Sequence, residues 1–526
     1  MKILLISIDL VLGTRILINV LKCQNFEVHN LQIVGIKYSD DFSDEVLHDI
    51  YDFVKGYEVV GLSFNSFYSL LAARLGNYLK GKGIKWVISG GPHVTALPKE
   101  AIKFSDVAVI HEAELTLPKL LRSLFKNEKS FSNVNGIVFK DRNGKVVNTG
   151  YPKFETNLNN IPFQSFCYED ITYYDFSNKT FKKPTIDNLF PHEGRNYFIM
   201  TSRGCPFKCT YCCNSLFAKV NNDFMKVRKR SVDNIISEMR KAKDFGFKGF
   251  YIADDNFLTF TFDEIKNFSR LYKSSIKLPF GVAGINPNNM RAIESAKKIE
   301  LLLNAGLSDV RIGVQSGSNK TLKIFNRKYT AEELPGLVKI FENRKTIWKG
   351  AKNKLRVAVD FICDAPWENE KDKLATLNLA NNLLSAYGVF FYTLIYLPGT
   401  DIYELALKEN WLHDRERDIY LRGIAGVDDN IYNRLFFLVA ILKERASRLP
   451  DEIIASVLDL HKDNPDLAEK FIDFIIKVVN DIESHHGFNL EHLTLHPYLK
   501  GFNKWEKTVG QRGRKVLFRS YHEPYG

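Results

Sequence analysis

Between residues 196 and 405, short apolar runs alternate with segments of helical periodicity. This alternation is typical of βα units, in which a helix connects each strand of a parallel sheet to the next. Six runs occur in succession, which predicts an α/β fold: an incomplete, TIM-type (β/α)6 barrel with its chemistry at the carboxyl ends of the strands. The runs span residues 197–200, 250–253, 280–285, 309–314, 356–362 and 389–396.

Polar residues follow these runs at the predicted ends of the strands. Asp254 and Asp255 follow the second run, Asn286 follows the third, and Gln315 and Ser316 follow the fourth. Acids and amides also cap helices and turns, so each residue taken singly is equally well explained as a cap. Their shared position at one end of the predicted barrel favours a functional site.

The loop after the first run contains four of the seven cysteines, Cys205, Cys209, Cys212 and Cys213. The C-x3-C-x2-C spacing of the first three fits one small inorganic cluster, because thiolates ligate the irons of iron-sulfur clusters. A [4Fe-4S] cube normally takes one thiolate per iron, so three ligands would leave one iron open to a small molecule. Structural zinc sites usually pair two C-x2-C knuckles, and the sequence has no second knuckle. In an extended chain the Cys213 side chain points away from that of Cys212, which predicts that Cys213 is not a ligand.

The length of 526 residues is sufficient for roughly two to four domains. No apolar run approaches the length of about 20 residues that a membrane span needs, and residues 2–12 are interpreted as a buried first strand rather than a signal peptide. A cytoplasmic protein with reduced thiols is therefore expected. The net charge of +12 favours anionic partners, but the basic segments 226–230 and 500–519 fit solvated surfaces better than stable nucleic-acid binding.

Residues 1–130 show the same alternation and predict a doubly wound, Rossmann-like parallel sheet. The ligand of such a sheet binds beyond the carboxyl ends of the strands. Ser63 follows one apolar run, and the pair Gly90 and Gly91 follows the next. Glycine lets a flat ligand approach the backbone closely, although the pair alone is equally consistent with a tight turn. The runs span residues 1–8, 59–63, 86–91 and 107–110.

Residues 131–195 are expected to form a linker that contains a β-hairpin, with its turn at Asn143 and Gly144. The core domain is expected to span 196–405, and residues 406–526 are predicted to be mainly helical. The histidines in this last region lack an ordered ligand spacing, so surface or packing roles are favoured over a metal site. Its predicted helices span 432–445, 452–461 and 467–484, and the histidines are at 485, 486, 492 and 496.

The stretch RGCPFKCTYC at 203–212 resembles the signature of the radical S-adenosylmethionine (SAM) superfamily. Three later stretches resemble landmarks of its cobalamin-dependent and methylthiotransferase branches: IGVQSGSNKTLKIFNRKYT at 312–330, VDFICDAPWE at 359–368 and LPGTDIYELA at 397–406. The resemblance implies that the first three cysteines of the loop hold a [4Fe-4S] cluster and that SAM chelates the open iron. Two positions depart from the pattern, since Gln315 stands where Glu is commoner and Asp364 where Gly is commoner. The SAM contacts that the resemblance implies are Phe207, Tyr211, Asp254, Asp255, Asn286, Gln315, Ser316 and Leu397.

The first domain resembles the cobalamin-binding domain that precedes many radical SAM enzymes. The resemblance is carried by GLSFNS at 61–66, ISGGPHVTALPKE at 88–100 and HEAELTL at 111–117, the last of which departs from the usual Gly-Glu-Gly-Glu. The loop at 9–14 has no histidine, which implies a cobalamin without a histidine lower ligand. The cobalamin contacts that the resemblance implies are Ser63, Asn65, Ser66, Gly90, Gly91, His93, Thr95 and Glu112.

Together, these resemblances imply a class B, cobalamin-dependent radical SAM methyltransferase that acts on an unactivated carbon through a 5′-deoxyadenosyl radical and methylcobalamin. Its substrate would be a small molecule, peptide or lipid, and flavodoxin or ferredoxin would supply electrons. A cobalamin-dependent cyclase or rearrangement enzyme uses the same parts and stays an alternative. A tRNA methylthiotransferase fits less well, because it needs a second cluster and the first domain contains only Cys23. A non-catalytic corrinoid or electron-transfer protein would not need the open iron.

Overall fold

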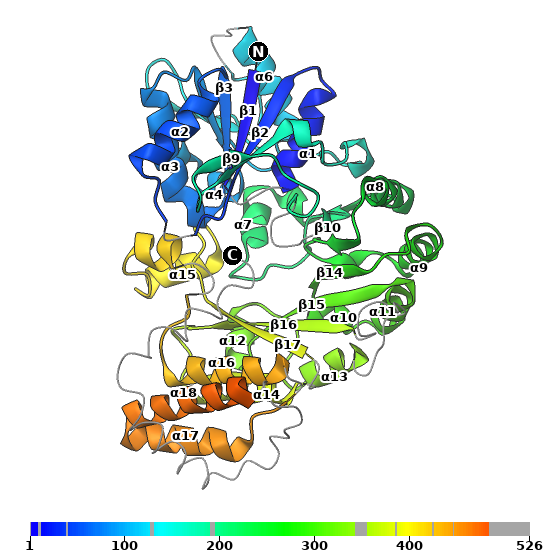
Figure 1. Ribbon diagram of the computed structural model, residues 1–526, viewed down its shortest axis with the longest axis vertical. Coiled ribbons are helices and arrows are strands. Elements are labelled where there is room, and N and C mark those ends of the chain that lie inside the picture. Colours follow the sequence, from blue (N-terminus) through cyan, green and yellow to red (C-terminus); the bar gives the residue numbers. More distant parts are fainter. Residues whose placement is uncertain are drawn as a thin grey trace.

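Two large sheets, the first mixed and the second parallel, organise the chain in the computed structural model (Figure 1). The first is at the top of Figure 1, and the second extends below it towards the C-terminal helices. Among the described helices, none combines the length and hydropathy that a membrane span requires. The structure describes residues 2–8, 12–37, 40–126, 131–189, 195–341, 355–383, 387–422, 426–444 and 447–482.

The first sheet has nine strands in the order β7-β6-β5-β4-β3-β1-β2-β8-β9. Its five central strands are parallel, and their order reverses direction at β1, which confirms the doubly wound prediction. Alternate residues of β1 face two cores, with Leu4 and Ile6 towards α2 and α3, and Ile3 and Leu5 towards α1 and α6. The central strands are β1 (Lys2–Ile8), β2 (Glu27–Val34), β3 (Val59–Ser63), β4 (Trp86–Gly90) and β5 (Val107–Val109). The helices are α1 (Leu12–Lys22), α2 (Asp44–Val54), α3 (Ser69–Gly81) and α6 (Thr116–Phe125).

Strand β2 is absent from the sequence prediction because polar residues interrupt its apolar pattern. Asn30 and Gln32 are nevertheless fully buried. The Asn30 amide donates to the Ser7 hydroxyl at 3.0 Å, and the Gln32 amide donates to the Asn30 carbonyl at 2.7 Å. Side-chain hydrogen bonds therefore replace apolar packing on this strand.

The segment expected as a linker adds strands to both edges of the first sheet. The predicted hairpin is confirmed and pairs with β5, whereas a later strand pairs parallel to β2. The added strands are β6 (Ile137–Lys140), β7 (Val146–Asn148), β8 (Ile171–Asp175) and β9 (Thr180–Lys182).

The second sheet is parallel throughout, and its six strands lie in chain order. Since β10 and β17 are its two edges, the sheet is the predicted incomplete barrel, with α8, α9 and α11 along its outer face (Figure 1). The strands are β10 (Asn196–Ile199), β13 (Gly249–Ile252), β14 (Phe280–Ile285), β15 (Leu307–Gln315), β16 (Arg356–Cys363) and β17 (Tyr387–Thr393). The helices are α8 (Val232–Phe245), α9 (Phe262–Leu271), α11 (Ile293–Ala305), α13 (Leu334–Val338) and α14 (Glu370–Asn382). Helix α13 begins later than the sequence pattern suggests, because Pro335 is tolerated only in a first turn.

The three predicted C-terminal helices are present as α16 (Ile431–Glu444), α17 (Asp451–Asp463) and α18 (Pro465–Ile482). Helix α16 packs on β17, where the Phe391 and Phe436 rings stack with centroids 4.6 Å apart. Asp364, which directly follows β16 and whose side chain is 3% exposed, accepts a hydrogen bond from the Asn433 amide of α16 at 2.6 Å. These helices therefore cover the open edge of the barrel. The four predicted histidines and the basic segment 500–519 lie outside the described residues.

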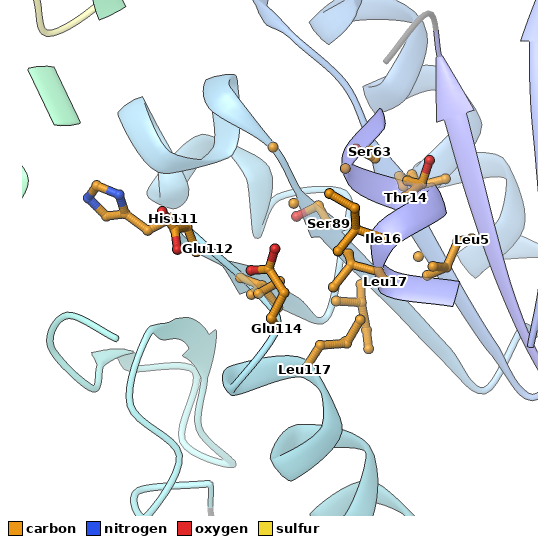
Figure 2. A pocket seen from close by; sticks show the side chains of 18 of the residues that line it. Leu5, Thr14, Ile16, Leu17, Ser63, Ser89, His111, Glu112, Glu114 and Leu117 are labelled. Atoms are coloured by element: carbon orange, nitrogen blue, oxygen red, sulfur yellow. The ribbon is translucent and has the colours of Figure 1, made fainter. Parts of the chain in front are cut away.

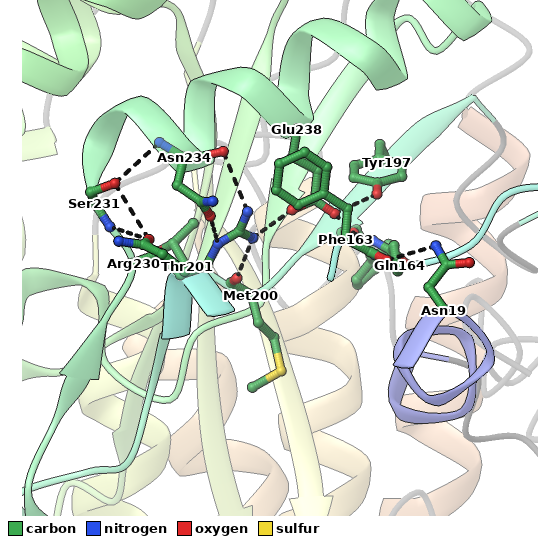
Figure 3. A network of polar contacts seen from close by, with 12 residues as sticks. Asn19, Phe163, Gln164, Tyr197, Met200, Thr201, Arg230, Ser231, Asn234 and Glu238 are labelled. Atoms are coloured by element: carbon green, nitrogen blue, oxygen red, sulfur yellow. Dashed lines mark hydrogen bonds and ion pairs between the residues drawn. The ribbon is translucent and has the colours of Figure 1, made fainter. Parts of the chain in front are cut away.

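A buried polar network fastens the connection between the domains (Figure 3). Glu238 of α8 pairs with Arg230 and accepts a hydrogen bond from the Tyr197 hydroxyl at 2.7 Å. The backbone N–H of Gln164 also donates to Glu238, at 3.4 Å. The neighbouring carbonyl of Phe163 accepts from α1 of the first domain. The network thus joins α1, the connection and the start of the barrel.

Glu238→Ala should destabilise the protein more than the loss of an ordinary ion pair. The change leaves the Arg230 guanidinium, 10% exposed, without its carboxylate, and breaking a buried pair costs about 3–5 kcal/mol. We expect the apparent melting temperature, measured by circular dichroism, to fall by at least about 5 °C. Asp52→Asn removes the exposed pair with Lys55 and serves as the control, with no resolvable change expected. Equal melting temperatures for the two variants would contradict the role given to the network.

Candidate functional site

A cavity of about 320 Å³ lies between the carboxyl ends of the first sheet and the cysteine loop of the barrel (Figure 2). Its deep part runs between the sheet and helices α1 and α6, where the walls are apolar. Its mouth is polar and includes residues from both domains. The deep walls include Leu5, Ile16, Leu17, Leu117 and Leu121, and the mouth includes Ser63, Glu112, Glu114, Arg203, Asn214 and Asp255.

Gly91 forms part of the cavity wall and has a backbone that only glycine adopts readily. Its φ of +108° lies in the left-handed region, and a Cβ at this position would be 2.5 Å from the Phe64 carbonyl oxygen. The neighbouring Gly90 also lines the cavity. The glycine pair therefore forms a tight turn and also leaves space in the cavity wall, so both explanations given for it from the sequence apply.

Four of the predicted cobalamin contacts line this cavity, namely Ser63, Gly90, Gly91 and Glu112. The other four do not. His93 is 3% exposed, its Nδ1 lies 3.0 Å from the Ser66 hydroxyl, and its ring packs against Tyr420 of the segment after the barrel. The Asn65 carboxamide caps a short helix by accepting from the Phe67 N–H at 2.9 Å.

The Thr95 hydroxyl accepts the N–H of His111 at 2.8 Å and donates to the Gly91 carbonyl. The chain enters helix α4 (Pro92–Ala96) directly after the glycine pair, which turns the side chains at 93 and 95 back into the first domain. Contacts at 93 and 95 had been implied by the resemblance of residues 88–100 to a cobalamin-binding domain.

Asp254 anchors the start of the cysteine loop. Its Oδ1 accepts the N–H of Thr201 at 2.6 Å, and its Oδ2 accepts the hydroxyl of Ser202 at 2.6 Å and that of Thr201. Burial raises the pKa of this carboxyl to about 6, so the group is an ionised acceptor at neutral pH. Predicted as a SAM contact, Asp254 instead holds the backbone that leads to Cys205.

Helix α12 (Asn319–Ile324) clamps the middle of the same loop. The chain reverses after this helix at Asn326, whose φ of +56° is the left-handed turn that commonly ends helices. The Asn326 amide donates to the Lys208 carbonyl at 2.7 Å. The Thr210 hydroxyl donates to the Ile324 carbonyl at 2.9 Å, and its N–H donates to the Phe325 carbonyl at 3.3 Å.

The three cysteines predicted as ligands lie together in this anchored loop. Cys205 and Cys209 are buried and Cys212 is half-buried. Burial raises the pKa of the Cys205 thiol to about 12, so its thiolate needs a cation such as iron beside it. Among the described residues, no three metal-binding side chains converge on one ion, but a cuboidal cluster takes each thiolate on a different iron. The thiol set therefore fits a cluster better than a single ion.

Cys213 is the first residue of helix α7 (Cys213–Val220), and Cys212 is its N-cap. The expectation that these two side chains diverge in an extended chain was wrong, because the helix begins between them. Their thiols are hydrogen-bonded, and this contact is the main cause that raises the pKa of Cys212. The assignment of Cys213 as a non-ligand stays a prediction.

Arg327 connects the cysteine loop to the ends of two barrel strands. Its Nη1 donates to the Cys209 sulfur at 3.3 Å and to the Tyr211 hydroxyl at 3.2 Å. Its Nη2 donates to the Asn286 carbonyl oxygen at 3.1 Å and to the Gly313 backbone carbonyl at 2.7 Å. Two predicted SAM residues, Tyr211 and Asn286, are therefore brought together by a residue that sequence reasoning did not select. Arg327 belongs to the NRKYT stretch at 326–330, which contributed to the family resemblance but was not interpreted as a source of site residues.

Gln315 and Ser316 are consecutive but face different surroundings. Gln315 has a φ of +78°, and its side chain lies over Gly313, whose carbonyl accepts a hydrogen bond from Arg327. Ser316 is fully buried, with its hydroxyl 3.1 Å from that of Thr376 and 3.3 Å from a Glu368 oxygen. The structure thus brings Gln315, but not Ser316, to the predicted SAM site.

Asp255 lines the cavity and accepts hydrogen bonds from the Asn214 amide at 2.8 Å and from the Gly204 N–H. Its side chain therefore faces the cysteine loop. Phe207 is half-buried within that loop, and Leu397 is half-buried in the apolar cluster beside it. Asp255 and Phe207 are thus placed at the cysteine loop, and Leu397 shares an apolar cluster with Tyr211 of that loop.

Two arginines and two glutamates form buried ion pairs across the domain interface. Arg203 and Arg228 are paired in the short ribbon of β11 (Ser202–Arg203) and β12 (Arg228–Lys229). Arg203 contacts Glu112 at 3.1 Å and Glu114 at 2.7 Å, while Arg228 contacts Glu112 at 2.9 Å. All four side chains are at most 16% exposed. We call these residues the interdomain charge cluster.

Known proteins resemble this chain in sequence and in fold. Residues 199–378 match the Radical SAM superfamily. An uncharacterised methyltransferase of Pyrococcus horikoshii is 26% identical over 412 residues, 77% of this chain and 76% of the relative. The solved structure of the radical SAM methyltransferase TsrM from Kitasatospora setae, with cobalamin and a [4Fe-4S] cluster bound, matches with a TM-score of 0.58 and 15% identity, covering 77% of this chain and 78% of TsrM.

A further solved structure is the cobalamin-dependent SAM radical enzyme OxsB with aqua-cobalamin bound. It matches with a TM-score of 0.59 and 16% identity over 96% of this chain and 79% of OxsB. Residues 199–378 are therefore similar to the Radical SAM superfamily, and the two sheets and the helical region of the chain share the fold of these two solved structures.

Proposed function

We propose that this protein is a cobalamin-dependent radical SAM methyltransferase that transfers a methyl group to an unactivated carbon. The observation that carries the proposal is the cavity that joins the carboxyl end of the first sheet to the cysteine loop. A corrinoid in this cavity would face a cluster on Cys205, Cys209 and Cys212. The names of the relatives, which include a methyltransferase and a cobalamin-bound radical SAM methyltransferase, support the same activity.

When bound, the cluster and the corrinoid supply reductive cleavage of SAM and methyl transfer, and the protein supplies position and water exclusion. The apolar walls formed by Ile16, Leu17 and Leu117 suit a heterocyclic tail inserted between the sheet and its helices. The glycine pair lets the flat part of the ligand approach the backbone. Asn286 and Gln315 would bind the polar groups of SAM.

We propose a cobalamin without a histidine lower ligand. Of the two histidines nearest the glycine pair, His93 is engaged by Ser66 outside the cavity wall. His111 lines the cavity, but its ring packs against Phe217 and Phe224 and is directed away from Ser63 and Ser89 in Figure 2. The substrate would be a small molecule, peptide or lipid, and a flavodoxin or ferredoxin would deliver electrons in the cytoplasm.

Two rival activities use parts of the same machinery. A cyclase or rearrangement enzyme would use both cofactors without net methyl transfer. A tRNA methylthiotransferase would need a second cluster in the first domain. The sequence of that domain contains one cysteine, Cys23, and its side chain is exposed. The second cluster of a methylthiotransferase would have to bind at the end of the first sheet. The cavity at that position favours a corrinoid instead.

Anaerobic reconstitution of the full chain tests the proposal. We expect about four irons per chain, the absorption bands of a bound corrinoid, and 5′-deoxyadenosine after reduction with SAM. Methyl transfer from labelled SAM to the corrinoid, measured by mass spectrometry, distinguishes methylation from rearrangement. Absence of bound corrinoid would overturn the cobalamin assignment, and absence of 5′-deoxyadenosine would overturn radical chemistry.

Cys209→Ala should abolish the cluster, because it removes one of three thiolates that the loop provides. Cys213→Ala should retain it, because Cys213 is predicted to be a neighbour of the ligands rather than a ligand. Iron content and the electron paramagnetic resonance (EPR) spectrum of the reduced protein measure the difference. Loss of the cluster in the Cys213 variant would show that the ligand assignment is wrong.

Glu112→Ala should broaden the distribution of distances between the two proposed cofactors. The change leaves Arg203 with one carboxylate and Arg228 without one, at a cost of about 3–5 kcal/mol for a broken buried pair. Pulsed EPR on the reconstituted protein should give a broader distribution of distances between cob(II)alamin and the reduced cluster. Glu100→Gln is the matched control, since its 2.8 Å pair with Arg415 also joins the first domain to the rest of the chain but lies outside the cavity. Equally narrow distributions in both variants would contradict a positioning role.

A further inference from the structure

The Arg327 guanidinium is buried at the mouth of the barrel and is fully engaged by hydrogen bonds. Only 8% of the residue is exposed. Four of its five hydrogen bonds reach Cys209, Tyr211, Asn286 and Gly313. In the fifth, Nε donates to the Tyr329 hydroxyl at 2.9 Å.

None of these five partners is a carboxylate, and no ion pair joins Arg327 to an acidic side chain in the described part of the chain. The buried arginines elsewhere near the loop, at 203, 228 and 230, each pair with a glutamate. A buried charge without a counter-charge is costly, by several kcal/mol or more. The surroundings of Arg327 therefore suit an anionic partner, and none of the side chains that contact it is a carboxylate.

Cys209 is the partner that can become that anion. Phenols ordinarily ionise only at about pH 10, so the hydroxyls of Tyr211 and Tyr329 are neutral partners of the guanidinium. The amide of Asn286 and the backbone carbonyl of Gly313 do not ionise. A cysteine that ligates iron, by contrast, is a thiolate.

We infer that Arg327 donates a charge-assisted hydrogen bond to the iron-bound thiolate of Cys209 and thereby raises the reduction potential of the cluster. The inference rests on the cluster of the proposed function. Hydrogen bonds to the sulfurs and nearby charge are established determinants of the potential of an iron-sulfur centre. Reduction adds negative charge, so a fixed cation at the sulfur stabilises the reduced form relative to the oxidised form. Arg327 is thus a positioning and tuning residue for the centre that reduces SAM.

The loop does not depend on Arg327 for its attachment to the barrel. Asn326 binds the Lys208 carbonyl, and Thr210 is held by two backbone carbonyls at the end of α12. Asp254 holds the start of the loop. Removal of the guanidinium charge should therefore leave a loop that still binds the cluster.

Arg327→Gln in the full reconstituted chain tests this role through the midpoint potential, measured by EPR-monitored redox titration without SAM. We expect the variant to keep about four irons per chain and to show a more negative potential than the wild type. Arg327→Lys, which keeps the charge but loses the planar fork, should lie between them. Lys328→Gln is the matched control: it removes one charge from the neighbouring exposed side chain, and its potential should equal that of the wild type.

An unchanged potential in Arg327→Gln with an intact cluster would overturn the inference and leave a purely structural role. If Arg327→Gln fails to retain the cluster, Tyr329→Phe replaces it, because this change removes the acceptor that orients Nε and keeps the guanidinium; it also removes the hydroxyl's hydrogen bonds to the Val314 and Gly313 carbonyls. A smaller negative shift is then expected, and its absence would likewise overturn the inference. Lack of a [4Fe-4S] cluster in the wild type would instead contradict the proposed function.

Discussion

The interdomain charge cluster is the interaction on which the arrangement of the cavity and the cysteine loop depends. Two arginines from a ribbon next to the cysteine loop meet two glutamates that follow β5 of the first sheet. Buried pairs of this kind contribute little net stability but penalise any geometry that separates them. They therefore define how the cavity wall and the cysteine loop face each other, more strictly than apolar contacts could.

The cysteine loop is fixed from three sides by different parts of the chain. Asp254 holds its start, α12 holds its middle, and Arg203 ties it to the first domain. The loop contains the left-handed Gly204, where a Cβ would be 2.5 Å from the Phe224 carbonyl oxygen. Because these restraints come from the fold itself, the thiols can be preorganised for a cluster whose binding then need not order the loop.

Much of this architecture can be predicted from the sequence, because apolar runs that alternate with helical periodicity indicate βα units. Parallel strands then bring their carboxyl ends to one edge of the sheet. The direction in which each side chain points cannot be predicted from this alternation. Ser316 adjoins Gln315 yet faces the interior, and His93 turns away because a helix begins at Pro92. The interdomain charge cluster could not be predicted either, since the pairing of charges from segments far apart in sequence depends on how the domains dock.

The position of β8 in the first sheet has a consequence for how this protein is made. Strand β2 has β1 on one side, but its other neighbour is formed by residues 171–175, far along the chain. During synthesis, the edge of β2 stays open until that segment leaves the ribosome, and an open edge is a template for association with other chains. A recombinant fragment that ends near residue 130 would keep this edge permanently, whereas one that extends beyond β9 would cover it.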